Sequence, residues 1–187
     1  MEIRQFDPRS VDVAAFAKQG GDESGSCALV LLDRLCDEAH SDAKPVADDL
    51  MHWRATGEMR SQRGAEPQVW LHLEGRARLA LVCQRCLQSV ETQLHARRSF
   101  QFVAGEDQAA AIDADSEDDV LALTRALDLI GLIEDELLLA LPLVPRHDVC
   151  PQPLKVQDDA DPFEERAHPF AALGSLKRKL PPADLPS

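Results

Sequence analysis

Two stretches on either side of residues 83–86 carry apolar side chains at every second position, the pattern of half-buried β-strands. In the first stretch one face is apolar and the other polar; the apolar face consists of Leu71, Leu73, Gly75, Ala77, Leu79 and Leu81, and the polar face of His72, Glu74, Arg76 and Arg78. In the second stretch Val90, Thr92, Leu94 and Ala96 alternate with Glu91, Gln93, His95 and Arg97. The pattern predicts two strands, over 70–82 and 87–103, joined as a hairpin at Cys83-Gln84-Arg85-Cys86.

The hairpin prediction can be tested against its own side chains. If Cys83 and Cys86 face each other, all apolar pairs fall on one face; these are Leu79 with Val90, Ala77 with Thr92, Gly75 with Leu94 and Leu73 with Ala96. On the other face, Arg78 meets Glu91 and Glu74 meets His95, which are favourable cross-strand pairs. A slip by one residue would mix the faces.

Other segments predict helices or further strands. Met51, Trp53 and Ala55 alternate with polar residues from Asp49 to Arg60, as in a strand, and residues 119–123 fit a strand or the first turns of a helix. Three segments suit helices: residues 11–17, ending at Gly20-Gly21; residues 25–38, with Ser26 as N-cap and Ala28, Leu31, Leu32 and Leu35 at helical spacing; and residues 128–140, with Asp128 as N-cap and Pro142 and Pro145 beyond its end.

The expected fold is α+β: an antiparallel sheet around the central hairpin with its Cys-x-x-Cys turn, packed by a few helices and followed by a flexible C-terminal tail. Residues 1–150 form the single domain of this prediction, with a mobile acidic insertion at 105–118. Residues 151–168, rich in Pro and Asp, are interpreted as a linker. Residues 169–180 form a short amphipathic segment with a basic end.

Composition limits the function. The 187 residues carry a net charge of −13, which argues against general nucleic-acid binding, yet residues 50–104 alone sum to +4. This uneven charge fits an acidic protein with one RNA-facing patch, and equally one with a basic protein partner. The start of the chain lacks a secretory signal pattern, and Glu134, Asp135 and Glu136 interrupt the longest apolar stretch, so a cytoplasmic protein is expected.

The cysteines suggest a metal site. Cys83-x-x-Cys86 at a turn and the later pair His147-x-x-Cys150 could together supply four ligands to one tetrahedral zinc. Reduced structural thiols and a redox pair are the alternatives, although redox chemistry favours a Cys-x-x-Cys at a helix N-terminus. Cys27 and Cys36 are interpreted as small core residues.

Basic residues form a candidate RNA-binding surface. It combines the polar face of the hairpin with its turn and with a cluster in the tail; the members are Arg76, Arg78, Arg85, Arg97, Lys177, Arg178 and Lys179. The alternative is a solvated sheet face partly neutralised by Glu74 and Glu91. The acidic run 134–136 points in different directions on a helix and is interpreted as a solvated face with one helix-capping or Arg-pairing carboxylate.

Three blocks in this order resemble the YceD family, the large ribosomal RNA subunit accumulation proteins. They are Val82–Leu87 with its two cysteines, Ile133–His147 with the run Leu-Ala-Leu-Pro-Leu-Val-Pro-Arg-His, and Pro169–Lys179. Only Asp148-Val149 separate His147 from Cys150, a shorter spacing than the family's pattern. The resemblance implies a bacterial cytosolic protein needed for synthesis, processing or stability of large-subunit rRNA, without a catalytic residue.

The expected function is therefore that of a non-enzymatic factor in ribosome biogenesis. Its partners would be large-subunit rRNA, a pre-ribosome or a basic ribosomal protein, with no membrane and no small-molecule substrate. Zinc is the one cofactor considered. Two alternatives stay open: a zinc-binding protein–protein adaptor, and an enzyme that is either a thiol oxidoreductase or a zinc hydrolase.

Overall fold

The computed structural model describes residues 6–64 and 66–151, which form an α+β unit around one five-stranded sheet. The strands, which follow one another in space in chain order, are β1 (Asp22–Ala28), β2 (Leu50–Arg60), β3 (Gln68–Val82), β4 (Ser89–Val103) and β5 (Asp119–Ala122). The first four are antiparallel, whereas β5 runs parallel to β4. The predicted α+β class is confirmed, but the sheet is mixed, because helix α3 (Glu106–Asp113) carries the chain back before β5 begins.

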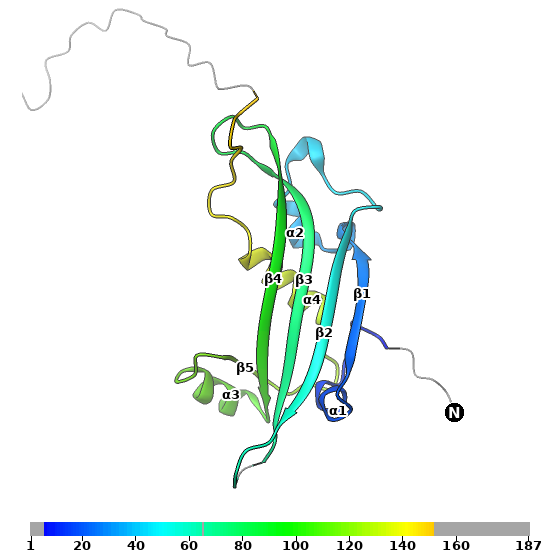
Figure 1. The fold of residues 1–187 in the computed structure, drawn as a ribbon, viewed down its shortest axis with the longest axis vertical. Coiled ribbons are helices and arrows are strands. Elements are labelled where there is room, and N and C mark those ends of the chain that lie inside the picture. The colour runs from blue at the N-terminus through cyan, green and yellow to red at the C-terminus, as the bar shows by residue number, and fades with distance from the viewer. Residues whose placement is uncertain (1–5, 65, 152–187) are drawn as a thin grey trace, which may run out of the picture. The chain divides into compact units, whose positions relative to one another are not determined.

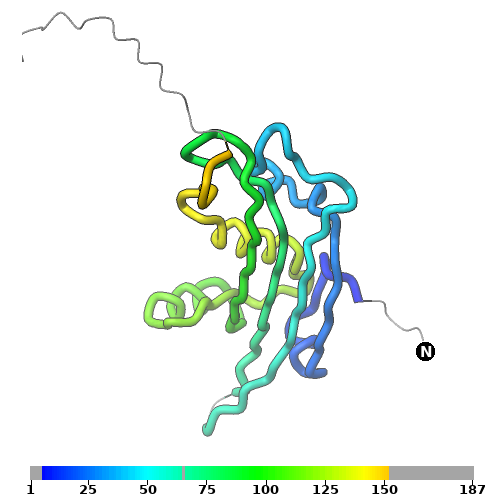
Figure 2. The backbone as a smooth tube through the Cα atoms, turned by 45° about the horizontal axis from the view of Figure 1, so that its top comes forward, coloured from blue at the N-terminus to red at the C-terminus, as the bar shows by residue number. Residues whose placement is uncertain are grey.

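Three helices cover one face of the sheet (Figures 1 and 2): α1 (Val13–Lys18), α2 (Asp33–Asp37) and α4 (Leu129–Leu139). Helix α1 packs on β2 and β3, α4 packs on β3 and β4, and α2 contacts α4. No helix within the described residues is long and apolar enough to cross a membrane.

Apart from Trp70, which is buried on the opposite face under Arg60, the buried side chains of β3 and β4 from Leu71 to Phe100 lie on the face toward α4, as the period of two predicts. Leu71, Leu79 and Leu81 are buried on this face of β3, and Phe100 on that of β4. Gly75 lets α4 approach closely, because a Cβ atom at this position would lie 2.7 Å from Cγ2 of Ile133. The apolar face of the hairpin is therefore the floor of the hydrophobic core.

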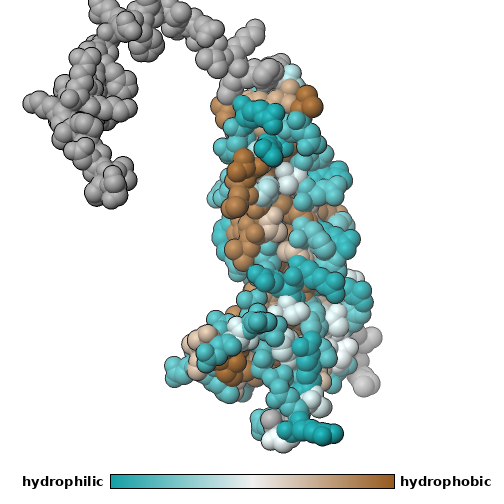
Figure 3. Space-filling model, turned by 60° about the vertical axis from the view of Figure 1, so that its left-hand side comes forward, coloured by the Kyte–Doolittle hydropathy of each residue, from teal (hydrophilic) through white to brown (hydrophobic). Residues whose placement is uncertain are grey.

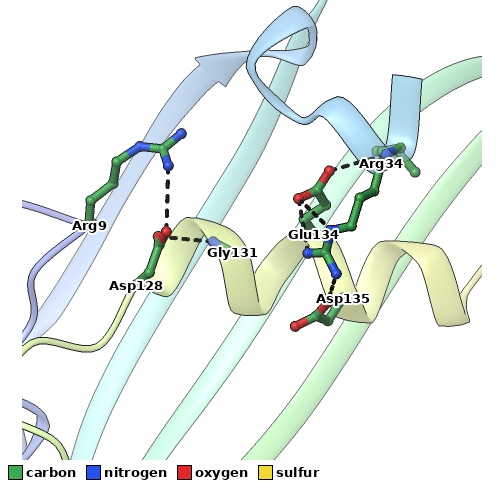
Figure 4. Close-up of polar contacts among 7 residues, drawn as sticks. Arg9, Arg34, Asp128, Gly131, Glu134 and Asp135 are labelled. Atoms are coloured by element: carbon green, nitrogen blue, oxygen red, sulfur yellow. Dashed lines mark hydrogen bonds and ion pairs between the residues drawn. The ribbon is translucent and has the colours of Figure 1, made fainter. Parts of the chain in front are cut away.

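Helix α4 is fixed at its first turn by its N-cap. Asp128 accepts a hydrogen bond from the amide of Gly131 at 3.0 Å and pairs with Arg9 at 3.5 Å (Figure 4). The cap satisfies an amide that has no partner inside the helix. The predicted helix over 128–140 with this cap is confirmed.

The acidic run of α4 ties the covering helices together (Figure 4). Glu134 is buried and accepts bonds from the Arg34 guanidinium at 3.0 Å and from the Leu35 amide at 3.1 Å, while Asp135 also pairs with Arg34. Glu136 pairs with Arg98 of β4 at 3.1 Å. The sequence suggested one helix-capping or Arg-pairing carboxylate in a solvated face; instead all three carboxylates pair with arginines, and Glu134 is buried.

The prediction of a helix over 25–38 capped by Ser26 is wrong. Residues 22–28 form β1, in which Ser26 pairs with His52 of β2. The chain then makes a 3-10 turn, Leu29–Leu31, before α2. The apolar spacing fits a helix, but pairing with β2 determines the conformation of the small residues of β1.

The predicted hairpin is confirmed, but its register is shifted by two residues. Leu79 lies opposite Thr92 instead of Val90, and Gly75 opposite Ala96. The turn is longer than predicted, because the amide of Cys83 donates to the carbonyl of Gln88 instead of Cys83 facing Cys86. A shift of two preserves both faces, so Arg78 still pairs with Glu91, now diagonally, at 3.3 Å.

Residues 106–113, inside the segment interpreted as an acidic insertion, form α3, and the mobility of this segment stays a prediction. The linker at 151–168, apart from residue 151, and the amphipathic segment at 169–180 lie outside the described residues.

Candidate functional site

The four residues predicted to bind zinc lie together at one end of the hairpin. Their ligand atoms all lie within 4.8 Å of one another. The sulfurs of Cys83 and Cys150 are 3.9 Å apart, and the sulfur of Cys86 is 3.5 Å from Nδ1 of His147. We call these four residues the thiol cluster. Every member could be identified from the sequence.

The backbone of the β3–β4 turn places the first two cysteines. The amide of Leu87 donates to the carbonyl of Cys83 at 2.9 Å, which closes the turn, and Leu87 adopts a left-handed conformation with φ 60°. Cys83 and Cys86 are both buried inside this turn. The turn therefore directs both sulfurs toward the protein and away from solvent.

Two hydrogen bonds hold the chain after α4 against this turn. The amide of Gln84 donates to the carbonyl of Pro145 at 2.8 Å. His147 lies 3.0 Å from the carbonyl of Ser89 through Nε2, which must donate there, so Nδ1 keeps its lone pair for the cluster. Such a second bond is how metal-binding histidines are usually oriented.

The spacing of the ligand atoms fits zinc. A tetrahedral ion with bonds of about 2.3 Å to sulfur and about 2.0 Å to nitrogen separates two sulfurs by roughly 3.8 Å and sulfur from nitrogen by roughly 3.5 Å. The separations of 3.9 Å and 3.5 Å in the thiol cluster match these values. Four protein ligands also fill a tetrahedron, which is typical of structural and not catalytic zinc sites.

The thiols differ strongly in acidity. Burial raises the pKa of Cys83, but hydrogen bonds from the amides of His147, Arg85 and Cys86 outweigh it and hold the pKa at about 5. Burial and the neighbouring sulfurs of Cys86 and Cys83 raise the pKa of Cys150 to about 11. The Cys83 thiolate is thus stabilised by amides of the turn and of the chain after α4 together, and a cation would be needed to stabilise several thiolates at once.

The remaining cysteines lie away from the thiol cluster. Cys27 packs against the core, and the thiol of Cys36 donates to the carbonyl of Leu29 at 3.1 Å. Both are partly buried, and burial raises the pKa of each.

Arg76, Arg78 and Arg97 of the predicted basic residues lie on the sheet face opposite α1, α2 and α4, which we call the open face. Arg76 pairs with Glu74, and Arg78 pairs with Glu91 at 3.3 Å. Arg97 is exposed and makes no ion pair within the described residues. Arg85 is exposed in the turn, next to the thiol cluster. Lys177, Arg178 and Lys179 lie outside the described residues.

Two further residues of the open face were not predicted from the sequence. His52 and Arg54 of β2 lie on the same face, because His52 is paired with Arg76 and Arg54 with Glu74. Alternation along β2 would have placed both residues there, since Met51, Trp53 and Ala55 are buried on the other side.

Comparison with known proteins decides the family. A model of the family described as "Large ribosomal RNA subunit accumulation protein YceD" matches residues 71–177. The chain belongs to the YceD family. The matched range begins in β3 and contains the whole thiol cluster and the predicted basic residues, apart from Arg178 and Lys179. The resemblance seen in the sequence is confirmed.

A relative from Haemophilus influenzae carries the name "Large ribosomal RNA subunit accumulation protein YceD". It is 28% identical over 179 residues, which cover 92% of this chain and 97% of the relative. The likeness thus also includes the N-terminal part that the family model leaves out. No solved structure matches the chain significantly. The YceD description names a role in large-subunit rRNA accumulation and no chemical reaction.

Proposed function

We propose that this YceD-family protein supports the synthesis, processing or stability of large-subunit rRNA as a non-enzymatic factor that contacts rRNA or the pre-ribosome through its open face. The observation that carries this proposal is the uneven cover of the sheet: α1, α2 and α4 occupy one face (Figure 1), and the exposed arginines Arg76, Arg78 and Arg97 of β3 and β4 stand on the other. The site of action is the cytoplasm, where a bacterial pre-ribosome is assembled.

The charge distribution supports contact with phosphates. The protein has a net charge of −13, but residues 50–104, which include β2, β3 and β4, sum to +4. Arg76 and Arg78 expose about two thirds of their side chains, 66% and 64%. Exposed arginines on a sheet can hold a phosphate backbone in place without reading its sequence.

A structural role for the thiol cluster supports the proposal that the protein is not an enzyme. A zinc ion held by Cys83, Cys86, His147 and Cys150 would have no open position for a substrate. The thiol with the lowered pKa, Cys83, is fully buried, whereas redox-active cysteines are partly exposed. Zinc would instead join the β3–β4 turn to the chain that follows α4.

Reversing three charges of the open face tests the contact with RNA. Arg76, Arg78 and Arg97 are replaced by Glu, and tagged protein is recovered from cells with its bound 23S-type rRNA precursor. Recovery should fall by about tenfold or more, because affinity decreases with every phosphate that no longer has a cationic partner. The control replaces Lys18, Arg63 and Arg125, which are exposed and lie off this face, by Glu. Equal recovery of rRNA with both variants would reject the open face as the site that contacts rRNA.

Elemental analysis tests the zinc site. Purified protein should contain one zinc per chain, and Cys86→Ser should lose it, while Cys27→Ser should keep it. Chelation should lower the free energy of unfolding by about 4 kcal/mol if free zinc was a thousand times its Kd. Less than about a tenth of an equivalent in the unchanged protein, with titratable thiols, would remove zinc from the proposal.

A protein–protein adaptor is the second candidate, favoured by apolar side chains exposed near the thiol cluster. Figure 3 views the side along which the chain after α4 runs, where apolar surface stands out among hydrophilic residues. The exposed apolar residues are Leu87 in the β3–β4 turn, Leu139 at the end of α4, and Leu143, Val144 and Val149 in the chain after α4. The partner would be a basic ribosomal protein, retained after nuclease treatment and released by salt; retention of rRNA alone would reject this candidate.

A further inference from the structure

Strands β2 and β3 separate before β3 ends, as the upper part of Figure 1 shows. Their pairing stops at His52 with Arg76, although β3 continues for six residues along β4, to Val82. The start of β2 stays with β1, where Leu50 pairs with Ala28. The sheet is therefore split at this place, and a wedge opens between the two pairs of strands.

A cleft of about 680 Å³ fills this wedge. Its volume lies within the range of about 300–1,000 Å³ that is usual for small-ligand sites. The apolar lining combines the exposed Leu50 with three residues of the core side that are almost fully buried, Leu29, Ala77 and Leu94. The split thus leaves Leu50 as the main exposed apolar surface of the cleft, next to the edge of the hydrophobic core.

The two walls of the cleft differ in charge. The wall from β3 and β4 carries Arg76, Arg78 and His95. The wall formed by the start of β2 and the loop before it carries Asp48, Asp49 and His52. Neither carboxylate forms an ion pair within the described residues, and one oxygen of Asp49 accepts a hydrogen bond from the Val46 amide at 2.8 Å. A ligand that fits both walls must combine an anionic group, a flat apolar middle and hydrogen-bond donors at its far end.

An unpaired nucleotide has this distribution of groups. Its phosphate can pair with arginine, its base can lie on an apolar floor, and the exocyclic amine of cytosine or adenine can donate to a carboxylate. A base inside a duplex offers neither its faces nor its pairing edge, so a single strand is required.

We propose that this cleft binds one unpaired nucleotide of an RNA strand, with its phosphate at Arg76 and Arg78 and the amino group of its base at Asp48 and Asp49. The inference rests on the proposed contact with rRNA and adds a preference for single-stranded RNA whose bases carry amines. Glu74 and Glu91 now hold the two arginines over the rim of the cleft, and a phosphate takes their place as the partner.

Fluorescence anisotropy with labelled 12-nucleotide probes of cytidine or uridine tests this inference. Both probes carry the same charge, but only cytosine offers an exocyclic amine. The full-length protein should bind oligo(C) about tenfold more tightly than oligo(U), since one good polar contact to a base discriminates by about this factor. A double-stranded RNA of equal length should bind more weakly than oligo(C).

Substitutions in the acidic wall give a second test, because the cleft and simple charge attraction predict different effects on RNA binding. Asp48→Asn with Asp49→Asn should reduce the preference for oligo(C) over oligo(U) to within about twofold, because neutral amides are weaker acceptors than carboxylates. If the open face attracted RNA by charge alone, removing two negative charges would strengthen binding of both probes equally. An unchanged preference in this variant would overturn the inference.

Substitutions in the basic wall distinguish binding in the cleft from binding to the open face as a whole. Arg76→Gln with Arg78→Gln should weaken binding of oligo(C) by about tenfold, which is about threefold per charge, and Arg97→Gln, outside the cleft, by less than about 1.5-fold. If each of the three substitutions reduced the affinity for oligo(C) equally per charge, the cleft would be rejected as the binding site. The proposed contact with rRNA through the open face would not be affected. If neither probe binds, the inference fails, and recovery of rRNA from cells decides the proposed function separately.

Discussion

From Gly75 to Leu79, the two faces of β3 carry opposite kinds of residues: the face toward α4 is apolar, and the open face carries arginines. The face toward α4 is closed: Leu79 is buried, and Gly75 has no side chain, so the helix can approach. On the open face, one residue away, Arg78 and Arg76 are largely exposed and pair with glutamates that solvent can replace. In this part of β3, the contacts that stabilise the fold are therefore concentrated on one side, which leaves the other side available for binding.

The largest expected effect comes from opening the closed face. Leu79→Ala should lower the free energy of unfolding by about 3 kcal/mol, because it removes buried apolar surface and leaves a cavity. Arg78→Ala, at the neighbouring position on the open face, should change it by less than about 1 kcal/mol. Urea unfolding followed by circular dichroism measures both, and equal losses would contradict the division between the faces.

A smaller loss is expected from adding one carbon to the closed face. Gly75→Ala should destabilise the protein by about 2 kcal/mol, since its Cβ would meet Cγ2 of Ile133 at 2.7 Å inside a packed core. The double variant Gly75→Ala with Ile133→Val keeps this methyl group, so it should not restore stability. Gly75→Ala with Ile133→Ala, which removes the methyl group, should lose less than the two single variants together. Additive losses would argue against the close contact.

The buried carboxylate of α4 should matter more than an exposed one. Glu134→Gln should lower the free energy of unfolding by about 1.5 kcal/mol, because charged hydrogen bonds to Arg34 and to the Leu35 amide are weakened. Glu91→Gln, which breaks the exposed pair with Arg78, should cost less than about 0.5 kcal/mol. Thermal unfolding of the two variants compares them directly, and the reverse order would reject the role given to Glu134.

The smallest expected effect concerns the pKa of Glu74 on the open face. Hydrogen bonds from Arg76 and His95 lower the pKa of Glu74 below its usual value. Since this pKa is lower in the folded protein than in the unfolded chain, the interaction stabilises the fold at neutral pH. Its contribution is lost as the pH falls through the folded-state pKa.

Carbon-13 NMR titration can follow this carboxyl. Arg76→Gln should raise the pKa of Glu74 toward its usual value, whereas Arg60→Gln, which affects the pair with Glu58 instead, should leave it unchanged. No movement of the Glu74 titration in Arg76→Gln would show that the guanidinium does not stay beside the carboxylate in solution.

The faces of the hairpin could be predicted from the sequence, but not its register. Alternation fixes which side chains share a face, and a shift by an even number of residues leaves that pattern intact. The length of the turn decides the register, and the bond from the Cys83 amide to Gln88 cannot be read from residue types. Likewise β1 has no alternating apolar residues, and only its pairing with β2 makes it a strand.

The members of the thiol cluster could be predicted, because few residue types bind zinc and their spacing in the chain is characteristic. The cleft could not, because it depends on where β2 stops pairing with β3. Asp48 and Asp49 gave no signal in the sequence, since acidic residues in a loop are ordinary. That these two residues form one wall of a cleft follows only from the three-dimensional arrangement of the strands.

The long separation between the halves of the thiol cluster also orders events during synthesis. Cys86 and His147 are 61 positions apart, so at roughly 5–20 residues per second the second half leaves the ribosome about 3–12 s after the first. The hairpin and its two cysteines can form within that delay, but four ligands exist only once α4 and the following loop have emerged. Capture of the ion would therefore be the last step in closing this unit, and would favour chains translated at least as far as Cys150.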